Sequence, residues 1–433
     1  MKLITDLHVH SHYSRATSRD LTLAGLARGA VTKGINLIAT GDMLHPKWTA
    51  EMKEQLVGDG SGFYTLHKEA VLAESAGTGG ADHLIPAMLQ VRFVVAGEVA
   101  CIYTKGGKVR RQHVLFVLPS IESAEKVQAV LEQAGRNIRS DGRPIIGMDV
   151  KDLLALFLKI EPATICIPAH IWTPWFSLFG SKSGFDSIQE CFEELSDHIW
   201  AVETGLSSDP AMNWRLSELN TRTILSHSDA HSCEKLGREA SIFDLPEPTF
   251  PALTQALKQK KNLLYTIEFF PEEGKYHADG HRACNAMLTP AESKKFNNLC
   301  PTCKLPLVIG VMNRVEELAD QAASVGQAVH QPFKHIIPLP EIVGEALGVA
   351  PGAKRARTAY AELIKAGGNE FAILLDVPLS DLHSMTTPEI AEGIKRVREG
   401  KVTVIPGYDG VYGTIQIFTP AERQGKQAQA KLF

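Results

Sequence analysis

The chain has 433 residues, which is enough for two or three domains that each bury a core of their own. Its hydrophobic fraction of 44% and charged fraction of 22% are ordinary for a soluble globular protein, and no apolar run approaches the roughly 20 residues of a membrane helix. The formal net charge of −4 gives no overall signal for nucleic acid, although basic residues cluster locally. Seven cysteines, an odd number, argue against a disulfide framework, and no signal-peptide pattern is present, so we expect a cytoplasmic protein.

Short apolar runs alternate with helical patterns from residue 1 to about 270. The first two runs, at residues 3–4 and 36–39, flank a helical pattern at 23–31 that Gly34 is suited to end. Strand–helix alternation over this length predicts an α/β barrel or a doubly wound sheet. Barrel enzymes gather their catalytic groups at the carboxyl ends of the strands, so polar residues after nearly every predicted strand favour the barrel. Those residues are His8, His10, Asp42, Glu98, His170, Glu203, Asp229 and His231.

One segment reads as a long hairpin. Residues 92–103 and 109–117 flank Gly106-Gly107, which is the signal of a two-residue turn. Pairing about that turn sets Ala100 opposite His113 and Glu98 diagonally across from His113 on the same face. Long side chains reach across such a diagonal, so Glu98 and His113 can serve one site.

Histidines and acids at strand ends are the strongest chemical signal. Side chains of a strand alternate faces, so His8 and His10 point the same way, as do Asp229 and His231. A set of histidine nitrogens and carboxylate oxygens suits zinc, manganese or iron better than calcium. A lone histidine near a strand end is usually a satisfied polar residue, but so many within reach of one pocket indicate a metal centre. We expect the metal ligands among His8, His10, Asp42, His45, Glu98, His113, His170, Asp229 and His231, and the catalytic residues among Asp229, His8, His10, Glu98 and His170.

A second cluster follows a predicted linker at 271–274. It consists of two close ligand pairs separated by a loop, which is the pattern of a closed tetrahedral zinc site. A redox Cys-x-x-Cys is the alternative, but no βαβ pattern surrounds it. His277 competes with His281 as the histidine ligand. We predict a structural zinc held by His281, Cys284, Cys300 and Cys303.

The metal residues carry a family resemblance. The motifs His8-x-His10 and Asp229-x-His231, with Glu98, His113 and His170, resemble the polymerase-and-histidinol-phosphatase (PHP) superfamily. That resemblance implies a distorted seven-stranded β/α barrel with a trinuclear metal centre.

Two departures leave the number of metals at two or three. Arg15 and Ala16 stand where the superfamily often has an acid or a histidine, and its adjacent Asp-His is opened here to Asp42-x-x-His45. His12 lies on the same strand face as His10 and is an alternative ligand, with a surface histidine as the other interpretation.

Over essentially its full length the chain resembles the endonuclease Q family. The resemblance rests on motifs at residues 41–48, 168–176, 275–284, 313–319 and 406–413. It implies a DNA-repair nuclease that cuts the phosphodiester on the 5′ side of a deaminated base (uracil, hypoxanthine or xanthine) or of an abasic site. The implied cofactors are the structural zinc and two or three divalent metals (zinc, manganese or magnesium) in the barrel.

Contacts to damaged DNA are predicted from aromatic and basic residues. Aromatic rings stack on bases or fill the space of an extruded base, and arginines bind phosphates. Packing beneath a loop, or support of a glycine-rich turn, is the alternative for the aromatic residues. The candidates are Trp172, Trp175, Arg110, Arg111, Arg282, Tyr408 and Tyr412. Residues Gln429 to Phe433 resemble the short peptide by which bacterial repair proteins bind the sliding clamp, with a frayed tail as the alternative.

We therefore predict an α/β protein with three domains. A PHP-type distorted (β/α)7 barrel spans 1–270, a small zinc-binding module with a helix spans 271–335, and a C-terminal α/β domain with a flexible tail spans 336–433. A small-molecule phosphoesterase of the same barrel, or a catalytically silent scaffold that binds DNA damage, are the alternative functions.

Overall fold

The computed structural model describes residues 1–72, 84–419 and 421–422. Contacts within the chain divide it into two units. The first comprises Met1–Val31, Ile35–Glu268 and Ile309–Lys334, and the second comprises Thr32–Gly34, Phe269–Val308 and His335–Phe433. Among the described residues, no helix combines the length and the apolar character needed to cross a membrane.

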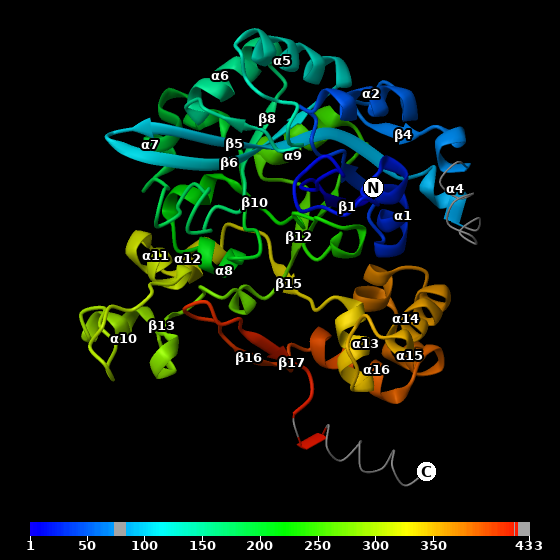
Figure 1. The fold of residues 1–433 in the computed structure, drawn as a ribbon. Coiled ribbons are helices and arrows are strands. Elements are labelled where there is room, and N and C mark those ends of the chain that lie inside the picture. The colour runs from blue at the N-terminus through cyan, green and yellow to red at the C-terminus, as the bar shows by residue number, and fades with distance from the viewer. Residues whose placement is uncertain (73–83, 420, 423–433) are drawn as a thin grey trace. The chain divides into compact units, whose positions relative to one another are not determined.

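The first unit is built around a mixed sheet (Figure 1). Its strands, together with the separate pair β9 and β10, are β1 (Lys2–Asp6), β2 (Leu37–Ala39), β3 (Leu56–Gly58), β4 (Tyr64–Leu66), β5 (Arg92–Lys105), β6 (Lys108–Leu118), β7 (Ile145–Ile146), β8 (Ile165–Pro168), β9 (Ala201–Glu203), β10 (Thr223–Leu225), β11 (Ala240–Asp244), β12 (Leu263–Glu268) and β15 (Phe333–His335).

The strand order defines how far the predicted architecture holds. The main path runs β15-β12-β11-β1-β2-β5-β4-β3, with β6 paired to both β5 and β8. β1 pairs in parallel with β2 and antiparallel with β11, whereas β9 and β10 form a two-stranded parallel sheet of their own. The predicted α/β class is confirmed, but a closed barrel is not confirmed by this strand order.

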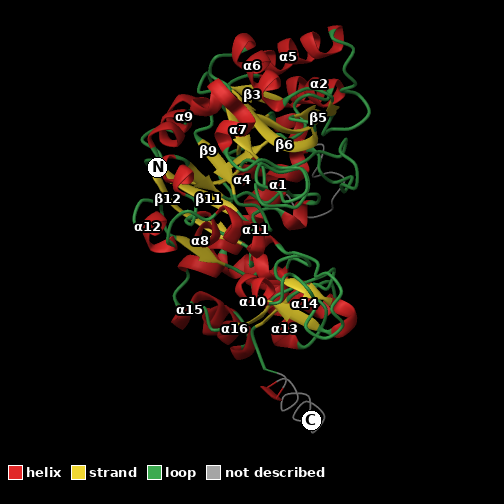
Figure 2. Ribbon diagram, turned by 90° about the vertical axis from the view of Figure 1, so that its left-hand side faces the viewer, coloured by secondary structure: helices red, strands yellow, loops and turns green. Residues whose placement is uncertain are grey.

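Helices lie along the outer side of these strands, as α2, α5, α6 and α9 do in Figure 2. The helices of the first unit are α1 (Leu23–Lys33), α2 (Pro46–Gln55), α4 (Ile85–Met88), α5 (Ile121–Gln133), α6 (Val150–Ile160), α7 (Ile188–Phe192), α8 (Pro210–Asn213), α9 (Phe250–Gln259), α11 (Val311–Leu318) and α12 (Ala323–Gln327).

Helix α6 illustrates why these segments are helical. Its buried residues Val150, Leu153, Leu154 and Phe157 recur at helical spacing and form one apolar face. The Phe157 ring stacks on Phe116 of β6, with 3.9 Å between ring centroids. The Asp149 side chain caps the start of the helix by accepting the backbone N–H of Lys151.

The predicted hairpin is formed by β5 and β6. Gly106 and Gly107 both have positive φ, +59° and +73°, as a tight two-residue turn of this kind requires. Ala100 pairs with His113 and Glu98 with Leu115 in the antiparallel register. The predicted register is therefore confirmed, and it brings Glu98 and His113 to one face of the hairpin.

A glycine determines how the loop after β2 meets the segment after β1. Gly41 has a φ of +68°, and a Cβ at this position would lie 2.6 Å from the carbonyl oxygen of Val9. Only glycine tolerates that approach. The following residue, Asp42, is thereby brought behind His10.

The second unit contains two small antiparallel sheets and a group of helices. The strands are β13 (Asp279–His281) paired with β14 (Ala286–Leu288), and β16 (Thr403–Ile405) paired with β17 (Thr414–Gln416). The helices are α10 (Pro290–Lys295), α13 (Leu339–Leu347), α14 (Lys354–Gly367), α15 (Leu379–Met385) and α16 (Pro388–Arg398), with a π-helical turn at Ala372–Asp376.

The C-terminal elements follow the sequence pattern closely. Thr387-Pro388-Glu389 is the pattern of a helix start and Gly400 suits a helix end, and α16 lies between them. The apolar run at 402–405 contains β16. The helical pattern from Asn313 to about residue 323 is divided between α11 and α12, which belong to the first unit. The division into three domains stays a prediction.

Arg314 of α11 holds a loop of the first unit from within the core. Its guanidinium donates to the carbonyl oxygens of Phe179 and Phe185 at 3.0 and 3.1 Å. It also pairs with Asp186 and Glu317 at 2.5 and 2.9 Å. This one buried side chain therefore satisfies backbone acceptors that would otherwise lose their partners.

Replacing Arg314 with Gln should destabilise the first unit. The two carbonyl oxygens and two carboxylates lose a charged donor, and a loss of this kind costs about 2–4 kcal/mol. Urea denaturation of R314Q should show a lower midpoint, and limited proteolysis should cut near residues 179–186 sooner. R19Q removes an exposed arginine of the same unit and should leave both measurements unchanged. Equal midpoints for R314Q and R19Q would contradict this role.

Candidate metal centre

The centre lies where the segment after β1 meets the segment after β10. An isolated parallel bridge joins Val9 to Ala230, and the backbone N–H of His10 donates to the carbonyl oxygen of Ala230 at 3.2 Å. This bridge aligns the His8-x-His10 motif with Asp229-x-His231. The two motifs that the sequence set 220 residues apart are thus neighbours.

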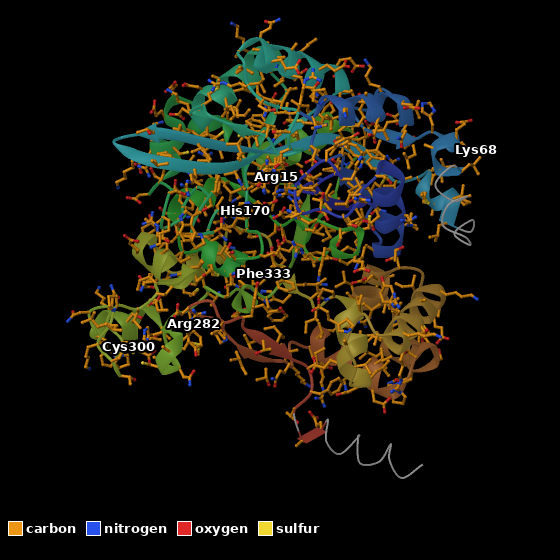
Figure 3. All side chains as sticks on the ribbon, in the orientation of Figure 1. Arg15, Lys68, His170, Arg282, Cys300 and Phe333 are labelled. Atoms are coloured by element: carbon orange, nitrogen blue, oxygen red, sulfur yellow. The ribbon has the colours of Figure 1, made fainter. Side chains whose placement is uncertain are left out.

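Two groups of ligand atoms result, and within each group the atoms lie no more than 4.8 Å apart. The first is His8, His10, Glu98 and Asp229, and the second is Glu98, His113 and His170 (His170 is labelled in Figure 3). Glu98 belongs to both. Its Oε1 lies 2.7 Å from His113 Nδ1 and 3.1 Å from His170 Nε2, while its Oε2 lies 3.6 Å from His10 Nε2 and 3.7 Å from His8 Nε2.

The donor set fits divalent metals. His8 is fully buried, and its Nδ1–H donates to Glu203 at 2.9 Å, which leaves the Nε2 lone pair facing Glu98 and Asp229. That Nε2 atom is buried and has no hydrogen-bond partner among the described residues. An inward lone pair beside two carboxylates is the arrangement that a metal ligand needs.

The charge of the site also calls for cations. Burial alone lowers the pKa of His8, but Glu203, Asp229 and Glu98 outweigh burial and raise that pKa well above its usual value. In the same way burial alone raises the pKa of Asp229, but His8 and His10 hold it below its usual range. Because Glu98, Glu203 and Asp229 are carboxylates placed close together in the protein interior, bound protons or metal ions must supply positive charge to balance them.

Glu203 organises the centre from behind, a role that the sequence did not assign to it. Its carboxylate accepts the Nδ1–H groups of His8 and His227 and the backbone N–H of His170. Burial by itself raises the pKa of Glu203, but the two histidines lower it to about 2. The signal available in the sequence was its position directly after a predicted strand.

Asp42 and His45 lie outside both ligand groups. Asp42 accepts hydrogen bonds from the backbone and hydroxyl of Ser11 and from Ser14, and it faces His10 Nδ1 at 3.2 Å. It orients His10 rather than joining the ligand atoms. His45 stacks on Tyr13 at 4.2 Å between centroids, and its Nε2–H donates to the carbonyl of Arg139.

His231 and His12 are also outside the two groups. The His231 ring lies 4.6 Å from the His10 ring, and its Nδ1–H donates to the carbonyl of Asp229. His12 sits beside Trp48, with its Nε2 3.9 Å from Glu51. Neither residue completes a third group among the described residues.

Of the DNA-contact candidates in the first unit, Trp172 and Arg110 do not fit the predicted role. Trp172 is 1% exposed, packs on Phe179 and donates to Asn213, so its ring has no free face for a base. Arg110 is buried over the Phe185 ring and paired with Glu190.

Trp175 and Arg111 remain available in the first unit. Trp175 is 47% exposed. Arg111 lies over the Phe176 ring, which itself contacts His113 with 4.6 Å between centroids.

In the second unit the candidates are Arg282, Tyr408 and Tyr412. Arg282 is exposed, and its backbone N–H donates to Asp409 at 2.7 Å. Tyr412 is 71% exposed. Tyr408 packs so closely on Gly280 that a Cβ there would lie 2.3 Å from its ring, as expected for a tyrosine that supports the turn.

The predicted zinc ligands lie together in the second unit. One of them, Cys300, is labelled in Figure 3. One ligand atom from each of His281, Cys284, Cys300 and Cys303 falls within 4.8 Å of the others, and Cys303 Sγ is 3.6 Å from His281 Nδ1. The backbone N–H of Cys303 lowers the pKa of the Cys300 thiol to about 6, which favours the thiolate that binds zinc. His281, rather than His277, belongs to the group.

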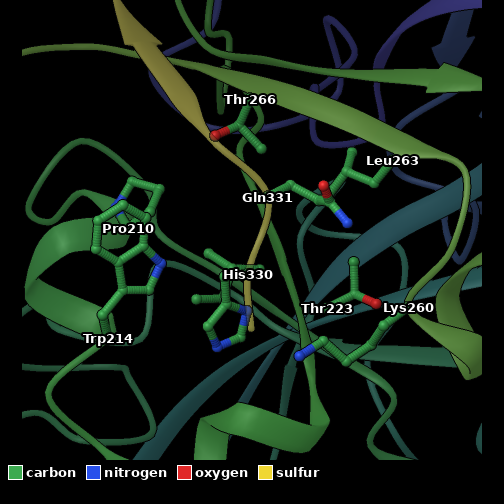
Figure 4. A pocket seen from close by; sticks show the side chains of 9 residues that line it. Pro210, Trp214, Thr223, Lys260, Leu263, Thr266, His330 and Gln331 are labelled. Carbon is green, nitrogen blue, oxygen red and sulfur yellow. The ribbon is translucent and has the colours of Figure 1, made fainter. Parts of the chain in front are cut away.

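A pocket elsewhere in the first unit is separate from this chemistry (Figure 4). None of its lining residues is a predicted ligand. Lys260 donates to the carbonyl oxygens of Asn220 and Val329, and burial lowers the pKa of His330 to about 4. The positive charge of Lys260 adds to burial in lowering the pKa of His330.

Comparison with known proteins gives relatives for nearly the whole chain. The uncharacterized protein YqxK of Bacillus subtilis is 30% identical over 433 residues, covering 96% of this chain and 99% of that protein. The uncharacterized protein MJ0043 of Methanocaldococcus jannaschii is 34% identical over 286 residues, which are 62% of this chain but only 35% of MJ0043. A family model described as the MJ0043 C-terminal domain matches residues 338–401.

Two solved structures share the fold at close to full length. PfuEndoQ, the lesion-specific endonuclease from Pyrococcus furiosus, matches with a TM-score of 0.81 and 27% identity, covering 96% of this chain and 95% of its own. Endonuclease Q in complex with a 27-mer duplex substrate that has an abasic lesion at the active site matches with a TM-score of 0.80, covering 98% of each chain.

The fold and the site define a hydrolase whose centre is built from histidines and a shared carboxylate. The chain belongs to the endonuclease Q family. It is therefore a DNA-cleaving hydrolase.

Replacing Glu203 with Gln should weaken metal binding without unfolding the chain. The amide keeps the shape of the side chain but removes the charge that makes His8 a stronger ligand, and such changes behind a metal ligand typically cost 10–100-fold in affinity. Calorimetric titration with Mn²⁺ should show this loss for E203Q. The matched variant E247Q changes an exposed glutamate and should bind as the unaltered chain does. Unaltered Mn²⁺ affinity in E203Q would contradict a role for Glu203 in metal binding.

Proposed function

We propose that the chain is a metal-dependent endodeoxyribonuclease that cuts the phosphodiester on the 5′ side of a deaminated base (uracil, hypoxanthine or xanthine) or of an abasic site. The observation that carries the proposal is the pair of ligand groups that share Glu98. The similar endonuclease Q structure with an abasic lesion at its active site supports damaged DNA as the partner.

The proposed centre holds two metals. His8, His10, Glu98 and Asp229 would hold one, and Glu98, His113 and His170 the other. The positions of Asp42 and His45 outside both groups support two rather than three. When bound, divalent zinc, manganese or magnesium supplies an activated water and neutralises charge on the phosphoryl oxygens.

The protein's own contribution is orientation. Glu203 fixes the His8 ring and Asp42 fixes the His10 ring, so both Nε2 atoms face inward. On the rim, Trp175 and Arg111 would contact a base and a phosphate, with Arg111 held over Phe176 beside the ligand His113. In the second unit, the exposed residues Arg282 and Tyr412 are the proposed DNA contacts, whereas Tyr408 packs on Gly280 and is assigned the supporting role.

The remaining parts of the proposal concern the architecture. We propose a PHP-type barrel at 1–270, a zinc module at 271–335 and a C-terminal domain at 336–433, with a structural zinc on His281, Cys284, Cys300 and Cys303. Binding to a sliding clamp through residues 429–433 stays a prediction, because those residues lie outside the described part of the chain.

The decisive test is cleavage of a labelled duplex that carries one uracil, hypoxanthine or abasic site, with Mg²⁺ or Mn²⁺. We expect one cut on the 5′ side of the lesion and none in the undamaged duplex. D229N should slow cleavage by more than ~100-fold, since it removes a charge from the ligand group itself. D197N changes an exposed aspartate of the same unit and should cleave normally.

Other outcomes of this assay would replace the proposal. Binding to the lesion without cleavage would make the chain a damage-binding scaffold. Hydrolysis of phosphomonoesters with no cut in DNA would make it a small-molecule phosphoesterase.

Replacing Cys300 with Ser should remove one equivalent of zinc. Serine is a poor zinc ligand at neutral pH, and the remaining three ligands cannot close a tetrahedral site. Elemental analysis of the purified protein should show the loss, and proteolysis should reach residues 279–308 more readily. C233S changes a cysteine of the first unit and should retain its zinc. Equal zinc content in the two variants would rule out the proposed site.

A further inference from the structure

The segment Asp141–Gly142–Arg143 is pressed into the centre by close contacts. The backbone N–H of Gly142 donates to the carbonyl of Tyr13 at 3.0 Å. A Cβ on Gly142 would lie 2.1 Å from Asp42 Oδ2 and 2.6 Å from Ser14 Oγ, so only glycine fits there. The position of this segment is therefore tied to the same Asp42 that orients His10.

Asp141 fixes the segment from its other side. Its Oδ1 accepts the backbone N–H groups of Arg15 and Arg143, each at 3.2 Å, and its Oδ2 lies 3.3 Å from Arg15 Nε. Arg15 is thus paired away from the ligand groups, and its side chain is largely exposed. Arg143 is the arginine that the segment delivers inward.

Arg143 reaches the carboxylate that the two ligand groups share. Its Nη1 donates to Glu98 Oε2 at 3.0 Å. The Glu98 side chain is completely buried, whereas that of Arg143 is 29% exposed. The guanidinium therefore lies on the more exposed side of Glu98, and it has further N–H groups with which to bind a ligand.

The charges in the loaded centre indicate what Arg143 faces. Four carboxylates belong to the ligand groups or touch their histidines: Asp42, Glu98, Glu203 and Asp229. Two divalent cations would balance them, so Glu98 would no longer need a guanidinium. Arg143 then adds one positive charge beside two metals, which is unfavourable unless an anion lies between them. A phosphodiester carries the single negative charge that is required.

We propose that Arg143 is a catalytic residue that binds the scissile phosphate, its guanidinium donating to a non-bridging phosphoryl oxygen at the edge of the two ligand groups. This inference rests on the proposed nuclease function. A planar, always charged donor held in advance by Asp141 and Gly142 suits the tetrahedral oxygens of a phosphate. Such a donor acts most strongly where charge builds up in the transition state.

The test compares R143Q and R143K with R139Q, which alters an exposed arginine of the same loop. Single-turnover cleavage of an abasic duplex should slow by about 10–100-fold in R143Q and by less in R143K, as loss of a charge-assisted phosphate contact predicts. R139Q should cleave normally. Elemental analysis should find equal metal content in all of these proteins.

Two further readouts separate phosphate binding from a structural role. A methylphosphonate at the scissile position removes one non-bridging oxygen, so the difference between R143Q and the unaltered chain should shrink. Calorimetry with inorganic phosphate and the Mn²⁺-loaded protein should show weaker binding in R143Q. A purely structural Arg143 would instead lower the metal content and leave the methylphosphonate difference unchanged.

The outcomes for this inference and for the proposed function are distinct. If the unaltered chain does not cut damaged DNA, the nuclease proposal fails, while phosphate calorimetry still decides the role of Arg143. If the unaltered chain cuts and R143Q cuts equally well, or if R143Q loses its metals, the inference about Arg143 is overturned.

Discussion

The buried carboxylate of Glu98 joins the two halves of the centre. One oxygen faces His113 and His170, and the other faces His8, His10 and the Arg143 guanidinium. Burial alone raises the pKa of Glu98, but His113 and His8 hold it well below its usual value, so it is a carboxylate in spite of its surroundings. The register of the β5–β6 hairpin places both Glu98 oxygens between the two ligand groups. The other residues of the two groups lie around this carboxylate.

Three residues around Glu98 have positive φ, a backbone conformation that residues other than glycine rarely adopt. Asp42, His170 and Asp229 have φ values of +45°, +29° and +47°. Each is compensated by hydrogen bonds: Ser11 and Ser14 donate to Asp42, Glu203 accepts the N–H of His170, and Arg238 donates to the carbonyl of Asp229. Strain of this kind persists where surrounding structure holds it, and here that structure is the shell behind the ligands.

Local signals in the sequence were sufficient for much of this arrangement. The Gly106-Gly107 turn determines the hairpin register and so the meeting of Glu98 with His113, and strand alternation pairs His8 with His10. Residues whose role depends on distant partners could not be found in this way. Glu203 was visible only as a polar residue after a strand, and Arg143 carried no motif at all, because its position depends on Gly142 packing against Asp42, 100 residues earlier.

The place of Trp172 and the pairing of the strands differ from the sequence-based expectation for the same physical reason. Trp172 lies two residues after His170 and was predicted to contact DNA, but its ring is buried and packs on Phe179. Strand–helix alternation predicts the α/β class but not which strands pair. The sequence therefore did not predict that β9 and β10 form a separate sheet. The alternation of strands and helices along the chain predicts layers of helices and sheet. Which strands pair depends on contacts between segments that are distant in the sequence.

The bridge between Val9 and Ala230 has a consequence for how the protein comes into being. His8 and His10 are translated more than two hundred residues before Asp229, so the two motifs do not become available together. β1 likewise waits for β11 as its antiparallel neighbour. Closing so long a loop is entropically slow, and segments made early fold while they wait. Until Asp229 has been translated, a nascent chain therefore lacks one member of the group formed by His8, His10, Glu98 and Asp229.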